Sequence, residues 1–433
     1  MSRDSQDGLE WKETLFHLIP LWTREPSMEA IESVCRQQLK ISVGRPCNAS
    51  FYASGAFNKL YLVICDDQSF LMRVTLPVCP HFKTRREVAT LRWVRDHTKI
   101  PVPEVLAFED NNNNDIGFEW ILMELMPGVP AYRRWRNMSM EQKTAITERI
   151  AEFQVQLFRC GTPPRPPFRK IGTLDLKTEQ GGADTPTGVS PGQLISHEFF
   201  MGNRLKYDVP RGPFRSSFDW LSSELRIIIL EQKAALENAE DNDDREDAEE
   251  ILVPTRKLLS LLPKVFPDDE EQEVTIALYH DDLSLHNILV DENGATTAVV
   301  DWECVSAKPM WVATITPKFL VGEIRDEEPI RDGYANGQPE ESVNKDGDPD
   351  DLDNEGKNEL YWIHQMEYET TQLRTVYKAK LREMWPDWPL EDNYLKVDFL
   401  EAVFQCGAVI FVKKVDRWVD SIERGDLIRW ADA

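Results

Sequence analysis

Cysteine is scarce in this sequence and follows no pattern typical of a structural site. The 433 residues include seven cysteines, an odd number, and no two of them form a C-x-x-C pair. This spacing excludes a small disulfide scaffold and offers no zinc-binding framework. We therefore expect reduced thiols and a cytoplasmic location.

Long apolar runs are also missing. The longest apolar stretch near the C-terminus, residues 399–412, is interrupted by Glu401 and Gln405 and is too short to cross a bilayer. The first residues are acidic and lack the apolar core of a signal peptide. We expect neither a membrane span nor a targeting segment.

Basic residues are outnumbered by acidic ones, 50 to 75, which gives a formal charge of −25. Nucleic acids and anionic membranes are bound through basic surfaces, so we expect neither as a partner. Segments 237–250, 268–273 and 323–356 together carry −23 of this charge. Their composition predicts solvated loops, with a disordered acidic insertion at 323–356. The alternative for these segments is a binding tail for a basic partner.

The order of helix and strand signals indicates three regions. Residues 1–40 contain helical patterns around 11–22 and 28–39 and predict an N-terminal helical extension. Residues 41–126 carry strand signals and predict a β-rich lobe. From 127 to 433 helices dominate, which predicts a larger helical lobe. The expected fold class is therefore α+β.

Specific signals support the two lobes. Residues 60–64 and 70–74 flank a polar turn and predict a β-hairpin, and 118–125 reads as another strand. The T-x-x-E pattern at Thr84 predicts a capping box that starts a helix running to about His97. The S-x-x-Q pattern at Ser139 predicts a second capped helix in the large lobe, and residues 395–430 return to a helical pattern.

The segment from residue 276 to 303 carries the chemistry. An Asn-Gly turn joins two apolar runs and predicts a hairpin. Asn287 stands just before one strand and Asp301 at the end of the other, so both side chains can meet at one edge, with Asp282 on the loop that leads in. Carboxylate and carboxamide oxygens suit Mg²⁺ that takes its other ligands from water and phosphate. This is an arrangement for phosphoryl transfer.

These residues resemble a known family. The pattern His280-x-Asp282-x-x-x-x-Asn287, followed by Asp301-Trp302-Glu303, is similar to the signature of the aminoglycoside phosphotransferase and choline kinase family, in a branch common in fungi. The resemblance implies a protein-kinase-like two-lobe fold and transfer of the γ-phosphate of ATP, or of GTP, to a small-molecule hydroxyl. It implies Asp282 as catalytic residue, His280 as its structural support, and Asn287 and Asp301 as Mg²⁺ ligands. The acceptor could bear an amine, as aminoglycosides and choline do.

The resemblance extends to the small lobe, where it implies the nucleotide contacts. It places Gly55 and Asn58 in a phosphate-covering loop, and Arg73 where the family has its strand cation. It makes Glu87 the helix acid that pairs with that cation, although a capping-box role would also explain Glu87. Arg73 departs from the usual lysine, and the two are not interchangeable in geometry.

The adenine-contacting hinge of the family corresponds to residues 123–126, with Glu124 and Met126 as the contacts. Since the glycine loop is poor and Arg73 replaces lysine, a catalytically silent pseudokinase that binds partners is the competing interpretation. Retention of Asp282, Asn287 and Asp301 favours the enzyme. The oligomeric state is left open by the sequence.

Overall fold

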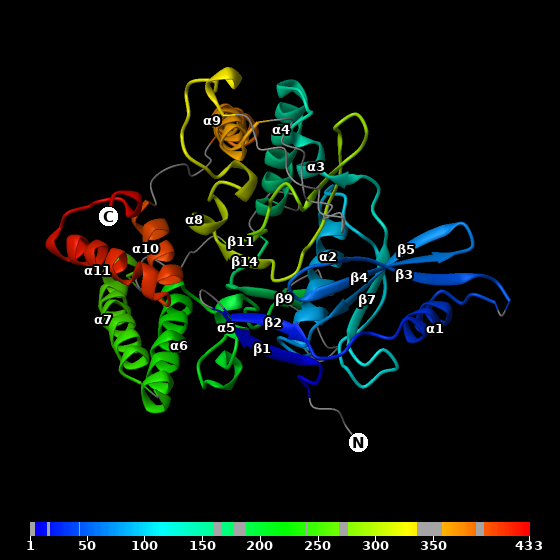
Figure 1. The fold of residues 1–433 in the computed structure, drawn as a ribbon, viewed down its shortest axis with the longest axis horizontal. Coiled ribbons are helices and arrows are strands. Elements are labelled where there is room, and N and C mark those ends of the chain that lie inside the picture. Colours follow the sequence, from blue (N-terminus) through cyan, green and yellow to red (C-terminus); the bar gives the residue numbers. More distant parts are fainter. Residues whose placement is uncertain are drawn as a thin grey trace.

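The computed structural model describes residues 5–14, 18–42, 44–159, 167–176, 188–239, 241–267, 276–335, 357–386 and 394–433. These residues form a small β-rich lobe and a larger, mostly helical lobe, which lie side by side in Figure 1. The α+β two-lobe prediction is confirmed.

A five-stranded antiparallel sheet forms the small lobe. Its strand order is β3 (Cys47–Ser54), β4 (Asn58–Cys65), β5 (Gln68–Thr75), β7 (Glu119–Glu124) and β6 (Val105–Glu109). The predicted hairpin is the β4–β5 pair, which runs in register from Asn58↔Thr75 to Cys65↔Gln68. Helix α2 (Phe82–His97) packs on β6 and β7 through Val88, which contacts the buried Ile121 and Met123.

The predicted capping box at Thr84 is wrong, because the helix begins earlier. Helix α2 starts at Phe82, so Thr84 and Glu87 lie inside it, and both side chains are buried. A residue inside a helix no longer caps the first turn. The predicted helix end at His97 is correct. Glu87 is therefore free of the capping role that would otherwise have explained it.

The N-terminal extension is only partly helical. Helix α1 (Met28–Gln38) is present and packs on β3, but the segment around 11–22 forms an antiparallel hairpin, β1 (Leu9–Glu13) with β2 (Leu18–Trp22). Pro20 has no N–H to continue a helix, and it pairs with Trp11 across the hairpin. Trp22 then packs on Phe118, with ring centroids 4.9 Å apart. The helix predicted around 11–22 is therefore wrong.

The large lobe places short strands around long helices. Its first part contains β8 (Val129–Pro130), α3 (Ala131–Trp135), α4 (Met140–Phe158), β9 (Gly172–Leu176), β10 (Val189–Pro191) and α5 (His197–Phe200). The predicted capping box at Ser139 is confirmed, since the Ser139 and Gln142 side chains bond each other's backbone N–H groups. Four strands pair in the order β10-β9-β14-β11, and three in the order β13-β12-β8. These include β11 (Ile276–Tyr279), β12 (Ile288–Val290), β13 (Thr296–Val299) and β14 (Ser306–Pro309).

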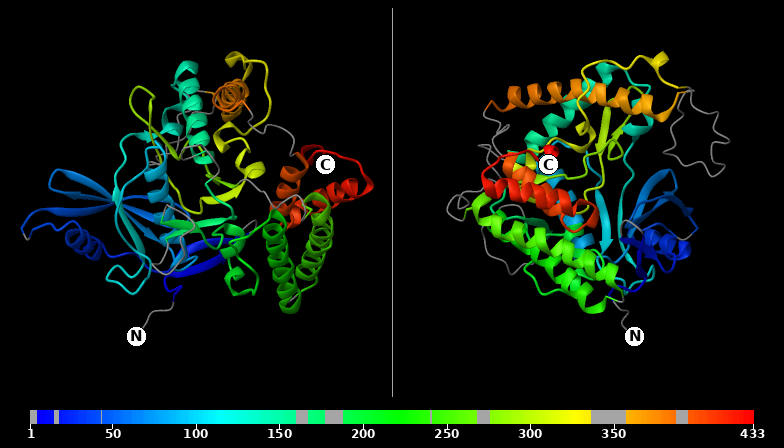
Figure 2. Two further views of the ribbon diagram at one scale, coloured as in Figure 1. Left: turned by 180° about the vertical axis from the view of Figure 1, so that it is seen from behind. Right: turned by 60° about the vertical axis from the view of Figure 1, so that its left-hand side comes forward.

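Long helices cover the far end of the large lobe. Both views in Figure 2 place α6 (Ser217–Asn238), α7 (Asn242–Val265), α10 (Tyr394–Gln405) and α11 (Val409–Arg424) together, away from the small-lobe sheet. Helix α9 (Glu359–Met384) packs separately on α4, and α8 (Met310–Ala313) packs on β11. Lys257 of α7 joins α11 through Asp416 and Asp420, at 2.8 and 2.7 Å. The predicted C-terminal helical region is thus present as α10 and α11.

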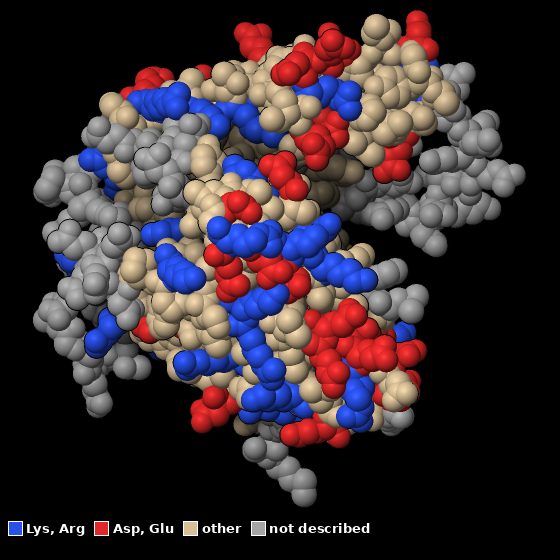
Figure 3. Space-filling model, turned by 90° about the vertical axis from the view of Figure 1, so that its left-hand side faces the viewer, with Lys and Arg blue, Asp and Glu red and all other residues tan. Residues whose placement is uncertain are grey.

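Two of the three acidic segments belong in part to the described residues, and both predictions need correction. Segment 237–250 is not a loop: it spans the end of α6 and the start of α7, where Asp241 caps the helix by accepting from Asp244 N at 2.9 Å. Carboxylates at a helix N-terminus are favoured by the helix dipole. On the face in Figure 3, acidic and basic side chains lie beside one another, and neither sign covers the face alone. Segment 268–273 lies outside the described residues.

The acidic insertion begins as an ordered segment. Residues 323–335 pack against α9, where Arg325 pairs with Glu367 at 2.9 Å and the Tyr334 hydroxyl contacts His364 Nδ1 at 2.7 Å. The prediction of disorder is therefore wrong for this part, and 336–356 lie outside the described residues. Among the residues that the structure describes, no helix is long and apolar enough to cross a membrane.

Candidate active site

The β12–β13 hairpin brings the two ends of the sequence motif together. Val300 N donates to the Asn287 carbonyl at 2.9 Å, so Asn287 and Asp301 are neighbours across the hairpin mouth. Strand β11 ends at Tyr279, and the loop from His280 to Asn287 leads directly into β12. The arrangement expected from the Asn-Gly turn is therefore present.

Asn287 fixes the loop that carries Asp282. Its Nδ2 donates to the Asp282 backbone carbonyl at 2.8 Å and to Asp282 Oδ2 at 3.0 Å. Both bonds use the amide nitrogen, so the carboxamide oxygen is the atom that remains to act as a ligand. Asp282 Oδ1 accepts from Lys318 Nζ at 2.9 Å, and the Asp282 side chain is about half exposed. The carboxylate is thus oriented on one side and accessible on the other.

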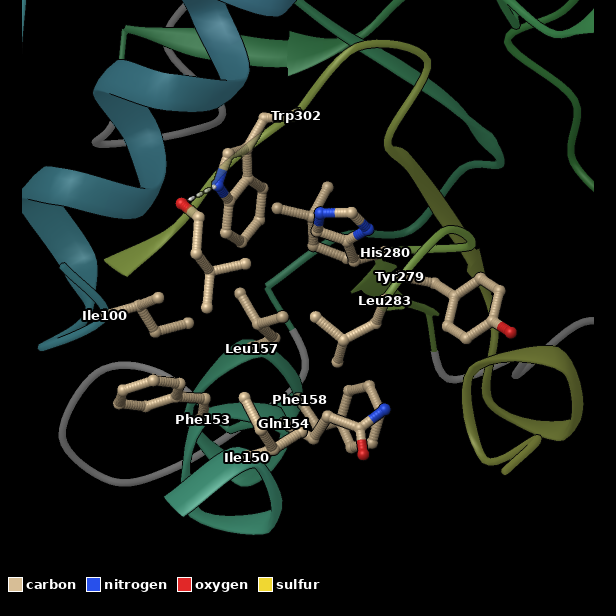
Figure 4. Close-up of a pocket in the computed structure, with 12 residues that line it drawn as sticks. Ile100, Ile150, Phe153, Gln154, Leu157, Phe158, Tyr279, His280, Leu283 and Trp302 are labelled. Atoms are coloured by element: carbon tan, nitrogen blue, oxygen red, sulfur yellow. Dashed lines mark hydrogen bonds between the residues drawn. The ribbon is translucent and has the colours of Figure 1, made fainter. Parts of the chain in front are cut away.

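Apolar side chains pack against this loop on the side that faces α4. Figure 4 shows His280 between Trp302 and Leu283, above Leu157 and Phe153 of α4. The space between these side chains is only about 10 Å³, so this is packed core and no ligand pocket. His280 Nε2 lies 3.2 Å from the Val300 carbonyl, and burial lowers the pKa of His280. A neutral His280 that holds the residue before Asp301 fits the supporting role predicted for it.

Asp301 has an unusual backbone. Its φ of 60° lies in the left-handed region, which aspartate tolerates better than most residues. Such conformations concentrate at functional sites because the surrounding structure must hold them. Arg73 Nη2 donates to Asp301 Oδ1 at 2.9 Å, and this contact leaves Oδ2 outside the ion pair. Burial, followed by the charge of Glu303, raises the pKa of Asp301.

Arg73 joins three carboxylates. Its Nη1 lies 3.2 Å from Glu87 Oε1, and its Nη2 lies 2.9 Å from Asp301 Oδ1 and 2.7 Å from Glu303 Oε2. The ion pair expected between Arg73 and Glu87 is therefore present. Burial raises the pKa of Glu87 to about 7, although Arg73 opposes this shift. The Arg73 guanidinium is thus held by protein groups on both Nη atoms.

Two members of this network were missed in the sequence. Lys83, at the start of α2, is 1% exposed and pairs with Glu303 Oε2. Glu303 belongs to the motif at residues 301–303, but the motif alone indicates no role for it. Burial opposes its charge, yet Lys83 and Arg73 hold the pKa of Glu303 well below its usual range. The signal available in the sequence was a lysine one helical turn before Glu87, which alone is too common to assign.

The small-lobe loop and hinge residues have different surroundings. Gly55 is exposed, and a Cβ there would meet nothing within 4 Å. Asn58 is buried: its Nδ2 donates to Glu303 at 2.8 Å and its Oδ1 accepts from Thr75 at 2.9 Å. Asn58 thus extends the charge network, whereas Gly55 lies on the open loop between β3 and β4.

The predicted hinge follows β7. Glu124 is the last residue of that strand, and its carboxylate accepts from Glu104 N at 3.2 Å and from Arg95 at 3.4 Å. Met126 lies two residues further on and is partly buried. The structure therefore puts Glu124 and Met126 where the chain passes from the small lobe to the large one. Their contact with an adenine base stays a prediction.

The donor set at the hairpin fits a magnesium ion. In the described part of the chain, no group of three or more His, Cys, Asp or Glu side chains is arranged to hold a metal. Asn287 and Asp301 instead offer two oxygen ligands, each already oriented through its other atom. Mg²⁺ is commonly held by one or two carboxylate or amide ligands together with water and substrate phosphates. The residues fit a metal that arrives with a nucleotide.

Comparison with known proteins gives a family. A model of the phosphotransferase enzyme family matches residues 48–312, which is more than half of the chain. A subtelomeric hrmA-associated cluster protein of Aspergillus fumigatus is 27% identical over 346 residues, covering 71% of this chain and 64% of that protein. The clavilactone A biosynthesis cluster protein Y of Ampulloclitocybe clavipes is 23% identical over 240 residues, covering 55% and 53%. The chain therefore spans less than two thirds of the length of these relatives.

A solved structure gives a more distant likeness. The crystal structure of aminoglycoside phosphotransferase APH(4)-Ia aligns over 92% of this chain and 93% of that chain, with 14% identity and a TM-score of 0.43. This likeness is too low to support an argument, so the assignment depends on the family match. By that match, which includes the catalytic loop and its motif, the chain belongs to the phosphotransferase enzyme family.

Proposed function

We propose that this protein transfers the γ-phosphoryl group of ATP to a hydroxyl of a small molecule, with Mg²⁺ bound by Asn287 and Asp301. The observation that carries the proposal is the hydrogen bond from Asn287 Nδ2 to Asp282 Oδ2, at 3.0 Å. This bond puts a candidate metal ligand and a candidate catalytic carboxylate in one rigid loop. A cytoplasmic location remains part of the proposal.

In this mechanism Asp282 accepts a hydrogen bond from the acceptor hydroxyl and orients its oxygen toward the γ-phosphorus. The proton moves to Asp282 late, because phosphoryl transfer passes through a loose transition state. Asn287 holds the Asp282 carboxylate in place, and His280 holds the backbone at Val300. The bound metal would supply positive charge for the phosphate oxygens.

An acidic cluster lies beside the loop that carries Asp282, since the exposed Asp281 directly precedes Asp282. Glu224 of α6 is buried, accepts from Trp220 Nε1 at 2.6 Å, and has its pKa raised to about 8 by burial. Lys308 lies 3.7 Å from the centroid of the Trp220 ring, where the charges of Glu224, Glu198 and Asp281 all act on it. Glu224 is largely protonated below its raised pKa, and both Lys308 and Arg204 act on it, so Glu198 and Asp281 are the carboxylates that can favour a cationic ligand. We propose an amine-bearing alcohol as the acceptor.

A pseudokinase is the second candidate. The observation in its favour is that both Nη atoms of Arg73 are engaged by carboxylates, so Arg73 would have to rearrange to reach a phosphate. Against it, a binding module gains nothing from an oriented Asp282 and two oriented metal ligands. Turnover distinguishes the two candidates.

The first experiment is a calorimetric titration of the wild type and Asp301→Ala with ATP and with GTP, each with and without Mg²⁺. Magnesium-dependent binding that the substitution removes supports the nucleotide site. Release of ADP in the presence of amino alcohols, sugars or polyols then supports transfer. Binding without turnover on any of these acceptors favours the pseudokinase. Absence of nucleotide binding contradicts the transferase and also favours the pseudokinase, whose ligands would then be protein partners.

A further inference from the structure

Lys83 occupies a place in the site that the transfer mechanism does not use. It is 1% exposed, at the start of α2, one turn before Glu87. Its Nζ contacts Glu303 Oε2 and lies 3.3 Å from Asn58 Oδ1. A lysine is almost never this buried unless it is paired, so its position needs a reason.

Glu303 is the group that connects Lys83 to the metal ligand. Its Oε2 atom accepts from Asn58 Nδ2 at 2.8 Å and forms ion pairs with Arg73 Nη2, at 2.7 Å, and with Lys83. The same Nη2 of Arg73 donates to Asp301 Oδ1 at 2.9 Å. Glu303 and Asp301 therefore share one nitrogen of Arg73.

The charges in this network are nearly balanced. Arg73 and Lys83 face three carboxylates, Glu87, Asp301 and Glu303. Without Lys83, Glu303 would be an undercompensated buried charge and would draw on Arg73, the remaining cation. An unpaired buried charge is costly, so the Arg73 guanidinium would move toward Glu303 and away from Asp301.

We propose that Lys83 is a positioning residue of the nucleotide site: by neutralising Glu303, it keeps Arg73 shared with Asp301 and so holds the Asp301 carboxylate ready for the metal–nucleotide complex. Lys83 acts through Glu303 and does not touch the phosphates, because its Nζ is enclosed by Glu303 and Asn58. This inference rests on the proposed function.

The test is a double-mutant cycle with Lys83→Met and Glu303→Gln, measured by calorimetry with Mg²⁺-ATP and with ATP in EDTA. Lys83→Met should weaken Mg²⁺-ATP binding by about 10- to 100-fold, as loss of groups that orient a metal ligand typically does. It should also raise the Mg²⁺ concentration that gives half-maximal ATP binding. The double variant, in which the uncompensated carboxylate is gone, should recover to within about threefold of the wild type.

A matched control exists in the large lobe. Lys143 is 2% exposed and pairs with Glu369 at 2.7 Å, so it has the same burial and the same kind of partner at another place in the fold. Lys143→Met should lower the midpoint of thermal unfolding as Lys83→Met does, but leave Mg²⁺-ATP affinity unchanged. A similar loss of affinity in both variants would show a general structural effect and overturn the inference.

The remaining outcomes are also decisive. Unchanged Mg²⁺-ATP affinity in Lys83→Met overturns the inference. An equal loss of affinity in Lys83→Met and in the double variant also overturns it, because it would show that Lys83 contacts the nucleotide directly. Should Lys83→Met fail to fold, the double variant alone decides, since retained affinity supports action through Glu303 and lost affinity contradicts it. If the wild type does not bind Mg²⁺-ATP, the proposed function fails and the inference fails with it.

Discussion

Lys318 Nζ lies 2.9 Å from Oδ1 of Asp282, so the candidate catalytic carboxylate is held by a lysine on one oxygen and by Asn287 on the other. Lys318 belongs to a short 3₁₀ turn, Lys318–Leu320, that follows α8. Nothing in the catalytic-loop motif indicates this contact.

Replacement of Lys318 by methionine should lower the turnover number by a few fold, because Asp282 loses one of the two contacts that orient it. The pair is exposed, and exposed ion pairs contribute little, so the difference in turnover number between wild type and variant should be small. Because salt screens the pair in the wild type, this difference should decrease as the salt concentration is raised. Steady-state kinetics at two salt concentrations measure it. A change in nucleotide affinity would contradict this reading of Lys318.

Asp282→Ala should lower the turnover number by at least about 100-fold, as loss of a positioned acid–base group typically does. Nucleotide affinity should change little, because Asn287 still donates to the carbonyl of residue 282. Turnover and calorimetric binding, measured on the same folded preparation, test this. An equal loss of nucleotide binding would reassign Asp282 to the nucleotide site.

Asp301→Asn should weaken Mg²⁺-ATP binding by at least about 10-fold and leave metal-free ATP binding much less affected. The reason is that asparagine keeps the size of the side chain but loses the charge that both Mg²⁺ and Arg73 need. Asn287→Ala is the companion variant, since it removes the second proposed ligand. Equal weakening with and without Mg²⁺ would show that Asp301 supports the fold and is no metal ligand.

Glu119 gives a stability prediction with a defined pH dependence. It is 2% exposed, accepts from His81 N at 2.7 Å, and burial raises its pKa from 4.5 to about 7. Between these two values the folded chain holds a proton that the unfolded chain releases, so this group lowers the free energy of unfolding as pH rises from 4.5 to 7. Glu119→Gln keeps the acceptor and removes the titration.

Relative to the wild type, Glu119→Gln should therefore gain stability between pH 5 and pH 8, on the order of 2–3 kcal/mol. Urea unfolding at both pH values measures the difference. A difference in the free energy of unfolding between variant and wild type that stays constant over this pH range would contradict the raised pKa of Glu119.

The catalytic loop could be predicted because its information is local. His280, Asp282 and Asn287 lie within eight residues, and a recognisable hairpin turn leads to Asp301. The first hairpin could not be predicted from periodicity, because its apolar residues also fit a helical period and only Pro20 indicates against a helix. The composition of segment 237–250 is typical of a loop, but its carboxylates also stabilise the N-terminus of α7, and charge alone does not distinguish the two.

Lys83, Glu303 and Lys318 could not be assigned from sequence, because their roles depend on partners far along the chain. Lys83 meets Glu303 only after α2 has packed on the small-lobe sheet and the lobes have come together. A buried lysine also looks like any surface lysine until its burial is known. The family motif predicts the metal ligands but says nothing about the groups that balance their charge.

The network around Arg73 joins the two lobes electrostatically. Arg73, Lys83 and Glu87 come from the small lobe, and Asp301 and Glu303 from the loop after β13. Separating the lobes would leave two cations with a single carboxylate, Glu87, and two acids with no cation from this network. The empty protein should therefore resist separation of its two lobes. The two lobes of this protein are thus joined by charge as well as by the chain that connects them.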